Sequence, residues 1–198
     1  TQQGLSLADI SAIGISNQRE TFLVWDEDGR PLHPAVVWQC KRSVRICENL
    51  KEKGLEQTVR ERTGLMIDPY FSATKLIWLF ENNAGVKAAI QSGKAMFGTI
   101  DTWLMYKLTG GEVYATDYTN ASRTLMFNLH TLSWDAELIE AYGLTGLRLP
   151  DIRSSSFSFG HTTLGDIFSH PVPVSALIGD SHAAAFGEGC FEAGTAKA

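Results

Sequence analysis

Apolar and polar positions alternate along the chain in a way that predicts strands and helices in turn. Short apolar runs predict buried strands at residues 10–15, 95–98 and 172–178. Elsewhere apolar residues recur every three or four positions, which predicts helices over residues 41–53, 55–62, 72–82, 86–91, 102–108, 135–142 and 181–186. Because strands and helices alternate, the pattern predicts an α/β fold.

One further pair of apolar segments predicts a β-hairpin. Residues 22–25 and 32–38 flank the turn-forming residues 26–29, which end in Asp-Gly. An Asp-Gly pair between two β-prone runs is typical of a hairpin. Pro34 would place the second strand at an edge or at a bulge, because proline has no N–H to donate to a neighbouring strand.

Two polar stretches are expected to lack regular structure. Residues 116–123 are turn-forming, and residues 154–165, rich in Ser, Thr and Gly, read as a connector. Asp101 and Asp135 each precede a helical segment, so both are expected to cap helix N-termini.

The charge balance limits the partners of the protein. The 198 residues carry 17 basic and 22 acidic side chains, a net charge of −5. This charge disfavours binding to nucleic acid or to anionic membranes, both of which favour basic surfaces. No apolar run reaches the ~18 residues of a membrane span. We therefore expect neither nucleic acid nor membrane as a partner.

Cysteine and glycine motifs exclude several kinds of site. Cys40, Cys47 and Cys190 are odd in number and form no CxxC pair, so reduced thiols in a cytoplasmic protein are expected. The five histidines lack metal-ligand spacing, and His182 is expected to line its helix. Neither GxxxxGK[ST] nor GxGxxG occurs.

Asp180 is the clearest candidate for chemistry. It follows the predicted strand 172–178 and the turn-permitting Gly179, where a helix is expected to begin. Ligands of open α/β sheets bind outside the carboxyl ends of strands. A carboxylate there can accept a proton from a substrate hydroxyl or hold a cation. The alternative is a helix cap.

Arg19, Glu20, Trp38 and Tyr70 suggest a site for a small polyol. Arg19 and Glu20 follow the first predicted strand and could donate to and accept from hydroxyl groups. Trp38 and Tyr70 could form an apolar wall against the carbon side of such a molecule. The alternatives are a surface ion pair for Arg19 and Glu20, and core packing for the two aromatic residues.

Several sequence blocks, taken in order, resemble the FGGY family of carbohydrate kinases, and in particular its glycerol-phosphorylating members. The resemblance runs from about residue 10 to the end of the chain. The blocks that carry it are residues 16–21 (SNQRET), 35–39 (AVVWQ), 63–65 (TGL), 67–72 (IDPYFS), 98–103 (GTIDTW), 116–124 (TDYTNASRT) and 179–180 (GD).

The resemblance implies an actin-like, or ribonuclease-H-like, ATPase fold. It implies transfer of the γ-phosphoryl group of ATP, with Mg²⁺, to a terminal hydroxyl of glycerol. By position, Arg19, Glu20, Tyr70 and Asp180 match residues that bind the acceptor in this family, and Trp38 matches a residue that packs near its carbon backbone. Asp180 also matches the catalytic base, and it could contact Mg²⁺ through a water molecule.

Two departures from the family pattern bear on these expectations. Ser181 stands where the family usually has a Gln that contacts the acceptor, so a larger polyol or a sugar such as a pentulose is an alternative substrate. The phosphate loops of the family are also not found in the chain. Residues 1–198 are therefore expected to be an incomplete acceptor-binding first domain of a two-domain kinase, inactive alone and prone to self-association.

Two other functions remain open on the residues alone. A glycoside hydrolase would use Glu20 and Asp180 as its carboxylate pair, with Trp38 and Tyr70 as sugar platforms. A non-catalytic polyol-binding domain would use the same side chains without a nucleotide. Consumption of ATP would separate both from a kinase.

Overall fold

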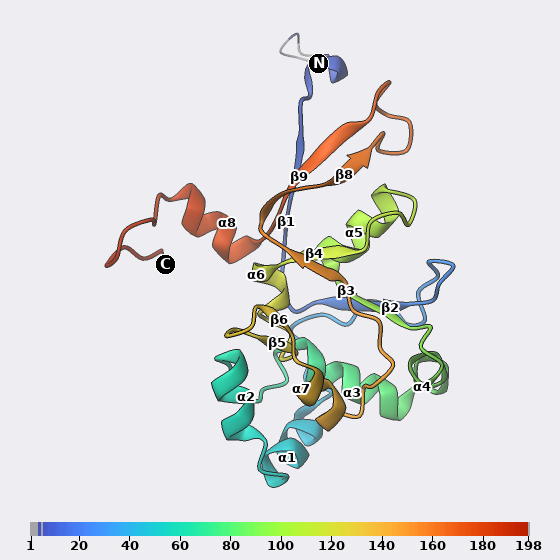
Figure 1. The fold of residues 1–198 in the computed structure, drawn as a ribbon, viewed down its shortest axis with the longest axis vertical. Helices are drawn as coiled ribbons and strands as arrows, with labels where there is room; N and C mark the ends of the chain where they lie inside the picture. Colours follow the sequence, from blue (N-terminus) through green and yellow to red (C-terminus); the bar gives the residue numbers. More distant parts are fainter. Residues whose placement is uncertain (1–3, 5, 198) are drawn as a thin grey trace.

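The computed structural model describes residue 4 and residues 6–197, and an α/β arrangement runs through them (Figure 1). A three-stranded sheet has the order β1-β9-β8. β1 (Ile13–Asn17) runs parallel to β9 (Val172–Gly179), and Asn17 lies opposite Gly179. Both strands therefore end at the same edge of the sheet, although they come from opposite ends of the chain. β8 (Ser156–Thr162) pairs with β9 in the antiparallel direction.

Three two-stranded sheets adjoin this one. β2 (Phe22–Trp25) pairs antiparallel with β3 (Met96–Thr99), and α5 (Ile100–Leu108) follows β3 directly. The other two sheets pair β4 (Ala115–Asp117) in parallel with β7 (Asp151–Arg153), and β5 (Phe127–Asn128) antiparallel with β6 (Ser133–Trp134). The four-residue helix α6 (Tyr118–Ala121) starts where β4 ends.

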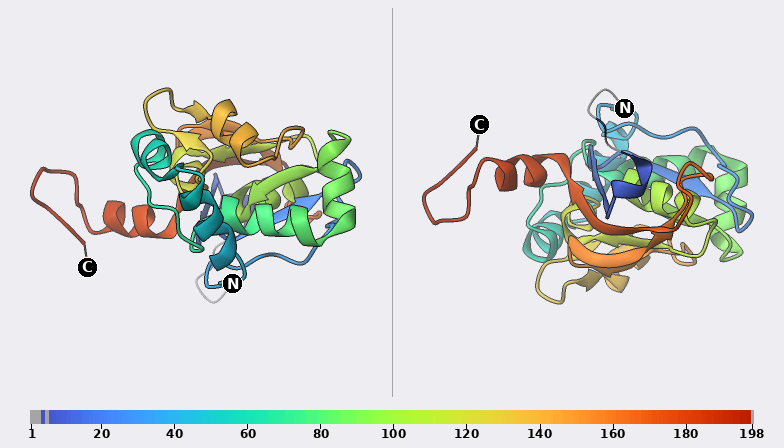
Figure 2. Two further views of the ribbon diagram at one scale, coloured as in Figure 1. Left: turned by 90° about the horizontal axis from the view of Figure 1, so that it is seen from below. Right: turned by 90° about the horizontal axis from the view of Figure 1, so that it is seen from above.

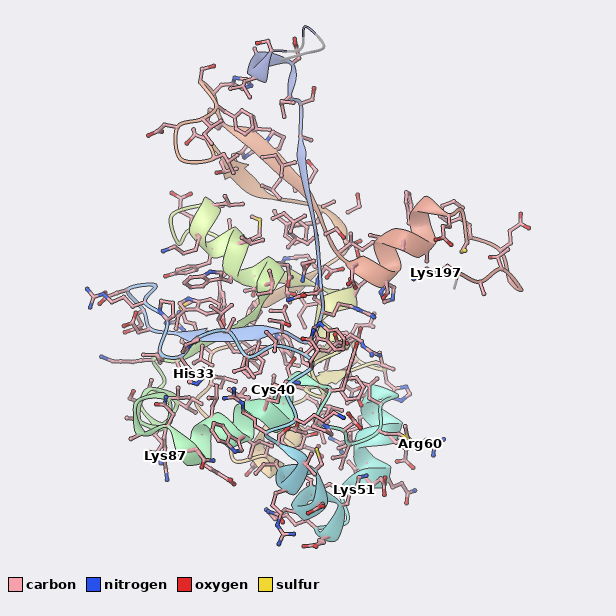
Figure 3. All side chains as sticks on the ribbon, turned by 180° about the vertical axis from the view of Figure 1, so that it is seen from behind. His33, Cys40, Lys51, Arg60, Lys87 and Lys197 are labelled. Carbon is pink, nitrogen blue, oxygen red and sulfur yellow. The ribbon has the colours of Figure 1, made fainter. Side chains whose placement is uncertain are left out.

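A layer of helices covers the side of β2 and β3 that faces away from the three-stranded sheet (Figure 1). Its members are α1 (Val44–Glu52), α2 (Glu56–Thr63), α3 (Ser72–Asn82), α4 (Ala84–Gln91) and α7 (Ala136–Ala141). Side chains from this layer and from β2 and β3 form the main core, with Phe22, Val59, Leu76 and Ile90 fully buried. Lys51, Arg60 and Lys87 lie at its outer surface (Figure 3).

The helices that periodicity predicted are present with small shifts of their ends. Asp135 caps α7 as expected, because its Oδ1 accepts a hydrogen bond from the backbone N of Leu138 at 3.0 Å. Asp101 does not cap α5. Thr99 is the N-cap residue, and Asp101 lies inside the first turn with its side chain fully buried. Its carboxylate instead accepts hydrogen bonds from Thr99 and Thr116, which supply the polar partners that water would otherwise give.

Two predictions of strand structure were wrong. Residues 26–29 do form the expected turn, but residues 32–38 form no continuous strand. They meet β2 through an isolated bridge between Val36 and Phe22 and through a hydrogen bond from Leu32 N to the Val24 carbonyl. The partner of β2 is β3, far along the chain. Residues 154–165 are not a mere connector, because most of them form β8, which is ordered by its pairing with β9.

The C-terminal part of the described chain leaves the body of the molecule. α8 (Asp180–Gly187) projects sideways from the end of β9 (Figures 1 and 2). η1 (Leu7–Asp9) precedes β1 and lies at the end of the molecule away from the layer of helices (Figure 1).

None of the helices in the described residues is long and apolar enough to cross a membrane. The three cysteines are free thiols, as expected.

Candidate active site

All six residues singled out from the sequence line one cavity of about 240 Å³. The cavity lies at the common end of β1 and β9, where the parallel pairing of the two strands brings residues from both ends of the chain together. Gln18 completes its lining, which consists of Gln18, Arg19, Glu20, Trp38, Tyr70, Asp180 and Ser181. The geometry matches the expected grouping, while the role of each residue remains a prediction.

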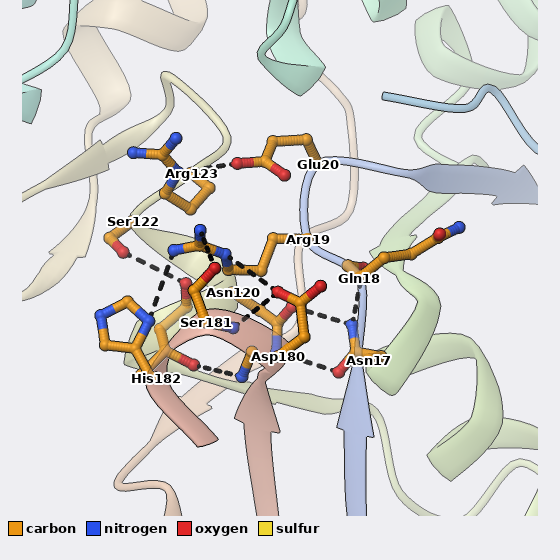
Figure 4. Close-up of polar contacts among 12 residues, drawn as sticks. Asn17, Gln18, Arg19, Glu20, Asn120, Ser122, Arg123, Asp180, Ser181 and His182 are labelled. Carbon is orange, nitrogen blue, oxygen red and sulfur yellow. Dashed lines mark hydrogen bonds and ion pairs between the residues drawn. The ribbon is translucent and has the colours of Figure 1, made fainter. Parts of the chain in front are cut away.

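The guanidinium of Arg19 contacts three successive residues of α8 (Figure 4). Its Nε lies 3.7 Å from Asp180 Oδ1, one terminal nitrogen donates to Ser181 Oγ at 3.1 Å, and the other lies 3.3 Å from His182 Nδ1. Gly179 makes this approach possible, because a Cβ atom there would lie 2.7 Å from Arg19 Cγ. Arg19 is thus fixed against the helix that carries Asp180.

Glu20 has a different partner from the neighbouring arginine. Its side chain is 3% exposed, and its Oε1 accepts from Arg123 Nε at 2.7 Å. The backbone of Glu20 has φ 63°, a left-handed conformation that is unfavourable for a residue other than glycine. Ser72 Oγ donates to the Glu20 carbonyl at 2.9 Å and holds this conformation. Arg19 and Glu20 are therefore not an ion pair with each other.

Trp38 and Tyr70 form an aromatic wall of the cavity. Their ring centroids lie 5.4 Å apart in an edge-to-face arrangement, and both residues are half-buried. Tyr70 also packs against the main core. The Arg123 guanidinium lies over the ring of Tyr70 at 5.8 Å, and over Phe71 at 4.9 Å. Arg123 therefore supports both the carboxylate and the aromatic side of the site.

The short helix α6 ties the ends of β1 and β9 together. Asp117 accepts from Thr119 Oγ1 at 2.7 Å and from Asn120 Nδ2 at 2.8 Å. Thr119 Oγ1 accepts in turn from the backbone N of Gly179 at 2.7 Å, next to Asp180. Asn120 Oδ1 accepts from Asn17 Nδ2 at 2.9 Å, at the end of β1. The sequence predicted only turns here.

His182 stands beside Arg19 rather than in a metal cluster. Burial and the positive charge of Arg19 lower the pKa of His182, which favours the neutral imidazole at pH 7. Its Nδ1 then accepts a hydrogen bond from Arg19. Nowhere in the described residues do three or more His, Cys, Asp or Glu side chains gather as a metal site.

Asp180 presents the more exposed of the two carboxylates at the cavity, with its side chain 56% exposed against 3% for Glu20. Mg²⁺ keeps several of its water molecules and is often held by one or two carboxylates plus substrate phosphates. This exposed carboxylate fits such a contact made through water, but it does not provide a cage for a metal ion.

Sequence reasoning missed Arg123 and the residues of α6. Arg123 belongs to the block 116–124 that carried the family resemblance, but it received no role. Glu20 could have indicated that such a partner exists, since a buried carboxylate requires a cationic or hydrogen-bonding partner. The sequence does not show which of its 17 basic residues is that partner.

Fold and site together define an α/β protein with a polar cavity, walled by two aromatic rings, at the carboxyl ends of parallel strands. Within that class, residues 1–187 match the N-terminal domain of the FGGY family of carbohydrate kinases. The chain belongs to this family, and the predicted actin-like fold is confirmed.

Individual relatives agree with this assignment. The chain is 48% identical to a glycerol kinase of Halothermothrix orenii over 98% of its own length and 39% of the relative's. It is 50% identical to a glycerol kinase of Carboxydothermus hydrogenoformans over 96% of its length and 38% of the relative's. The crystal structure of Plasmodium falciparum glycerol kinase with ADP superposes with a TM-score of 0.85 at 36% identity, covering 92% of this chain and 36% of that one. The chain thus spans about two fifths of the curated relatives.

Proposed function

We propose that this chain is the acceptor-binding domain of an ATP-dependent kinase that phosphorylates a terminal hydroxyl of glycerol. The observation that carries the proposal is the convergence of Arg19, Glu20 and Asp180 on one cavity walled by Trp38 and Tyr70. The relatives named glycerol kinase support the choice of acceptor. In this proposal a nucleotide-binding domain joined to these residues completes the kinase.

Each group at the cavity has a distinct task in this proposal. Arg19 donates hydrogen bonds to the polyol, and the carboxylate of Glu20 accepts from its hydroxyls. Trp38 and Tyr70 cover the carbon side. Asp180 orients the reacting hydroxyl and accepts its proton as the oxygen bonds to the γ-phosphorus of ATP. The bond from that phosphorus to the bridging oxygen of ATP breaks, and ADP leaves.

Mg²⁺, when bound with the nucleotide, neutralises charge on the phosphoryl oxygens. Asp180 is the group on this chain that would contact it, through water. A protein that uses ATP and carries three free thiols fits the reducing interior of the cytoplasm.

A larger acceptor is the second candidate. Ser181 replaces the usual Gln, and its side chain is shorter. An erythritol or a pentulose could use that space. A glycoside hydrolase is disfavoured, because Glu20 Oε1 is paired with Arg123. A carboxylate held by a guanidinium can still accept a hydrogen bond, but it is a weak nucleophile or general acid.

Asp180→Asn in the full-length kinase tests the proposal. The change keeps the size of the side chain but removes the proton acceptor, so kcat should fall by ~10²–10⁴ while the polyol Kd changes little. ADP release with glycerol and MgATP measures kcat, and calorimetry without nucleotide measures binding.

Asp28→Asn is the matched control, since Asp28 is 70% exposed in the turn between residues 26 and 29. It should behave as wild type. A decrease in kcat of less than threefold for Asp180→Asn would show that Asp180 is not the base. Absence of any polyol-dependent ADP release from the wild type would overturn the kinase assignment.

A further inference from the structure

Lys75 is a fully buried cation that the proposed mechanism does not use. It lies in the first turns of α3, and its relative exposure is 0%. Nζ donates to three successive backbone carbonyls, those of Pro69 at 2.7 Å, Tyr70 at 2.6 Å and Phe71 at 3.1 Å. Within the described part of the chain no carboxylate forms an ion pair with this ammonium group.

This arrangement is costly for stability. Burying an ammonium requires the loss of its hydration, and here only neutral carbonyl dipoles replace the water. Burial lowers the pKa of Lys75 to about 8, so at pH 7 the group still carries its proton. An ammonium has three N–H donors, one for each carbonyl. An apolar residue would avoid the desolvation of the ammonium, but it would leave the carbonyls of residues 69 and 70 without this donor. The specific effect of the lysine is therefore to hold the backbone of this segment.

The three carbonyls belong to the segment that presents Tyr70 to the cavity. The backbone N of Tyr70 donates to Asp68 Oδ1 at 2.8 Å, which fixes the start of the segment. The Tyr70 ring then contacts Trp38 on one side and lies beneath Arg123 on another. The direction of the Tyr70 side chain is set by the backbone that Lys75 binds.

We propose that Lys75 is a positioning residue for the acceptor, which holds the backbone of residues 69–71 so that Tyr70 and Trp38 form the cavity wall. The proposal rests on the proposed function, because it takes the polyol as the ligand of this cavity. Lys75 does not line the cavity, so it acts through Tyr70 and not by contact with the acceptor.

Lys75→Met in the full-length kinase is the direct test. Methionine keeps the length of the side chain but removes all three donors. The polyol KM should rise at least tenfold, whereas kcat at saturating polyol should stay within threefold and the nucleotide KM should not change. A merely structural role would lower the fraction of active enzyme, and hence kcat, and leave the polyol KM unaltered.

Lys51→Met is the control, because Lys51 lies on α1 at the surface with its side chain 45% exposed (Figure 3). It should leave both constants unchanged. If the wild type phosphorylates glycerol and Lys75→Met has a normal polyol KM, the proposal for Lys75 is overturned and the kinase function stands. If the wild type turns over no polyol, the function fails, and the polyol Kd of the two proteins still tests Lys75.

If Lys75→Met does not fold, the proposal can still be tested by a measurement on the wild-type protein. In protein labelled with ¹⁵N-lysine, the Nζ protons of Lys75 should exchange slowly with water at pH 7, unlike those of Lys51. Addition of glycerol should shift the Lys75 signal, since the segment it holds borders the acceptor. Rapid exchange, or a signal that glycerol does not move, would contradict the proposal.

Discussion

Arg19 shows how single residues of this site depend on their neighbours. Ser181 lies at the cavity, but its hydroxyl already accepts from Arg19 at 3.1 Å. The residue that departs from the family pattern therefore has two roles open to it, contact with the acceptor and support of Arg19. The longer amide of a glutamine could reach past Arg19 to a small acceptor.

Ser181→Gln in the full-length kinase should shift selectivity toward glycerol and away from erythritol or a pentulose. A neutral hydrogen bond gained or lost is worth ~0.5–1.5 kcal/mol, so the ratio of kcat/KM values should change by up to about tenfold. Steady-state kinetics with the three acceptors measures it. Identical ratios in both proteins would show that this position does not discriminate between acceptors.

At this scale the sequence predicted the residues of the cavity but not the partners that hold them. Arg19, Glu20 and Asp180 stand at strand ends, which is a local signal. The contact of Glu20 with Arg123 joins positions 103 residues apart, and nothing in either local sequence indicates it. The sequence also provided no indication of the role of Lys75, since its partners are backbone carbonyls, which every residue carries.

At the scale of secondary-structure elements, the carboxylate of Asp101 connects α5 to two strands. Its hydrogen-bond partners are hydroxyl groups, and no cationic side chain of the described residues pairs with it. Oδ1 accepts from Thr99 at the end of β3, and Oδ2 accepts from Thr116 on β4, both at 2.6 Å. Complete burial raises the pKa of Asp101 to about 6, and the nearby Asp117 adds to the shift. The charged form is therefore less favourable in the folded protein than in the unfolded chain.

This shift predicts a pH-dependent contribution to stability. Between pH ~4 and 6 the folded state holds a proton that the unfolded state has lost, so the contribution of Asp101 falls as the pH rises. Relative to Asp101→Asn, wild-type protein should lose about 2 kcal/mol of unfolding free energy from pH 4 to pH 7.

Urea unfolding of both proteins at several pH values gives this difference directly. Asp151→Asn serves as the control, because Asp151 is 70% exposed on β7. It should show no comparable trend. Parallel pH profiles for wild type and Asp101→Asn would contradict a raised pKa at this position.

The sequence predicted helices better than strands, for a physical reason. A helix such as α3 forms its hydrogen bonds within itself, so its apolar spacing and its ends are local features. β2 depends on β3, a partner distant in the chain, and β8 depends on the strand that follows it, β9. Neither the order of strands nor the pairing of β2 with β3 therefore follows from local pattern. Residues 156–162 carry many turn-forming side chains and still form a strand, because β9 supplies its hydrogen-bond partners.

For the whole molecule, two exposed surfaces bear on whether it associates with other chains: the free edge of β1 and the aromatic rings of the C-terminal segment. β1 is an edge of the three-stranded sheet, with its outer hydrogen-bonding groups unpaired in the described structure. On the projecting C-terminal segment, Phe186 and Phe191 pack edge-to-face with ring centroids 5.1 Å apart, and they remain 69% and 68% exposed. An unpaired edge and exposed aromatic rings both favour association with other chains.

The isolated 198-residue chain should therefore self-associate. Its apparent mass in sedimentation or light scattering should rise with concentration in the micromolar range. Phe186→Ser together with Phe191→Ser should reduce that rise, whereas Leu132→Ser, at an exposed position on the loop between β5 and β6, should not. A constant monomer mass at all concentrations would contradict the expectation.

The four-residue helix α6 has a consequence for how acceptor preference can change. Thr119 is bonded to the end of β9 and Asn120 to the end of β1. We therefore expect a substitution that shifts α6 to move the strand ends next to Asp180 and Arg19 together. Substitutions on the walls alter one side at a time. Selection for a new acceptor size therefore has two routes through this fold: a coarse adjustment in α6 that changes the width of the cavity, and a fine adjustment at its lining residues that changes which hydroxyls are recognised.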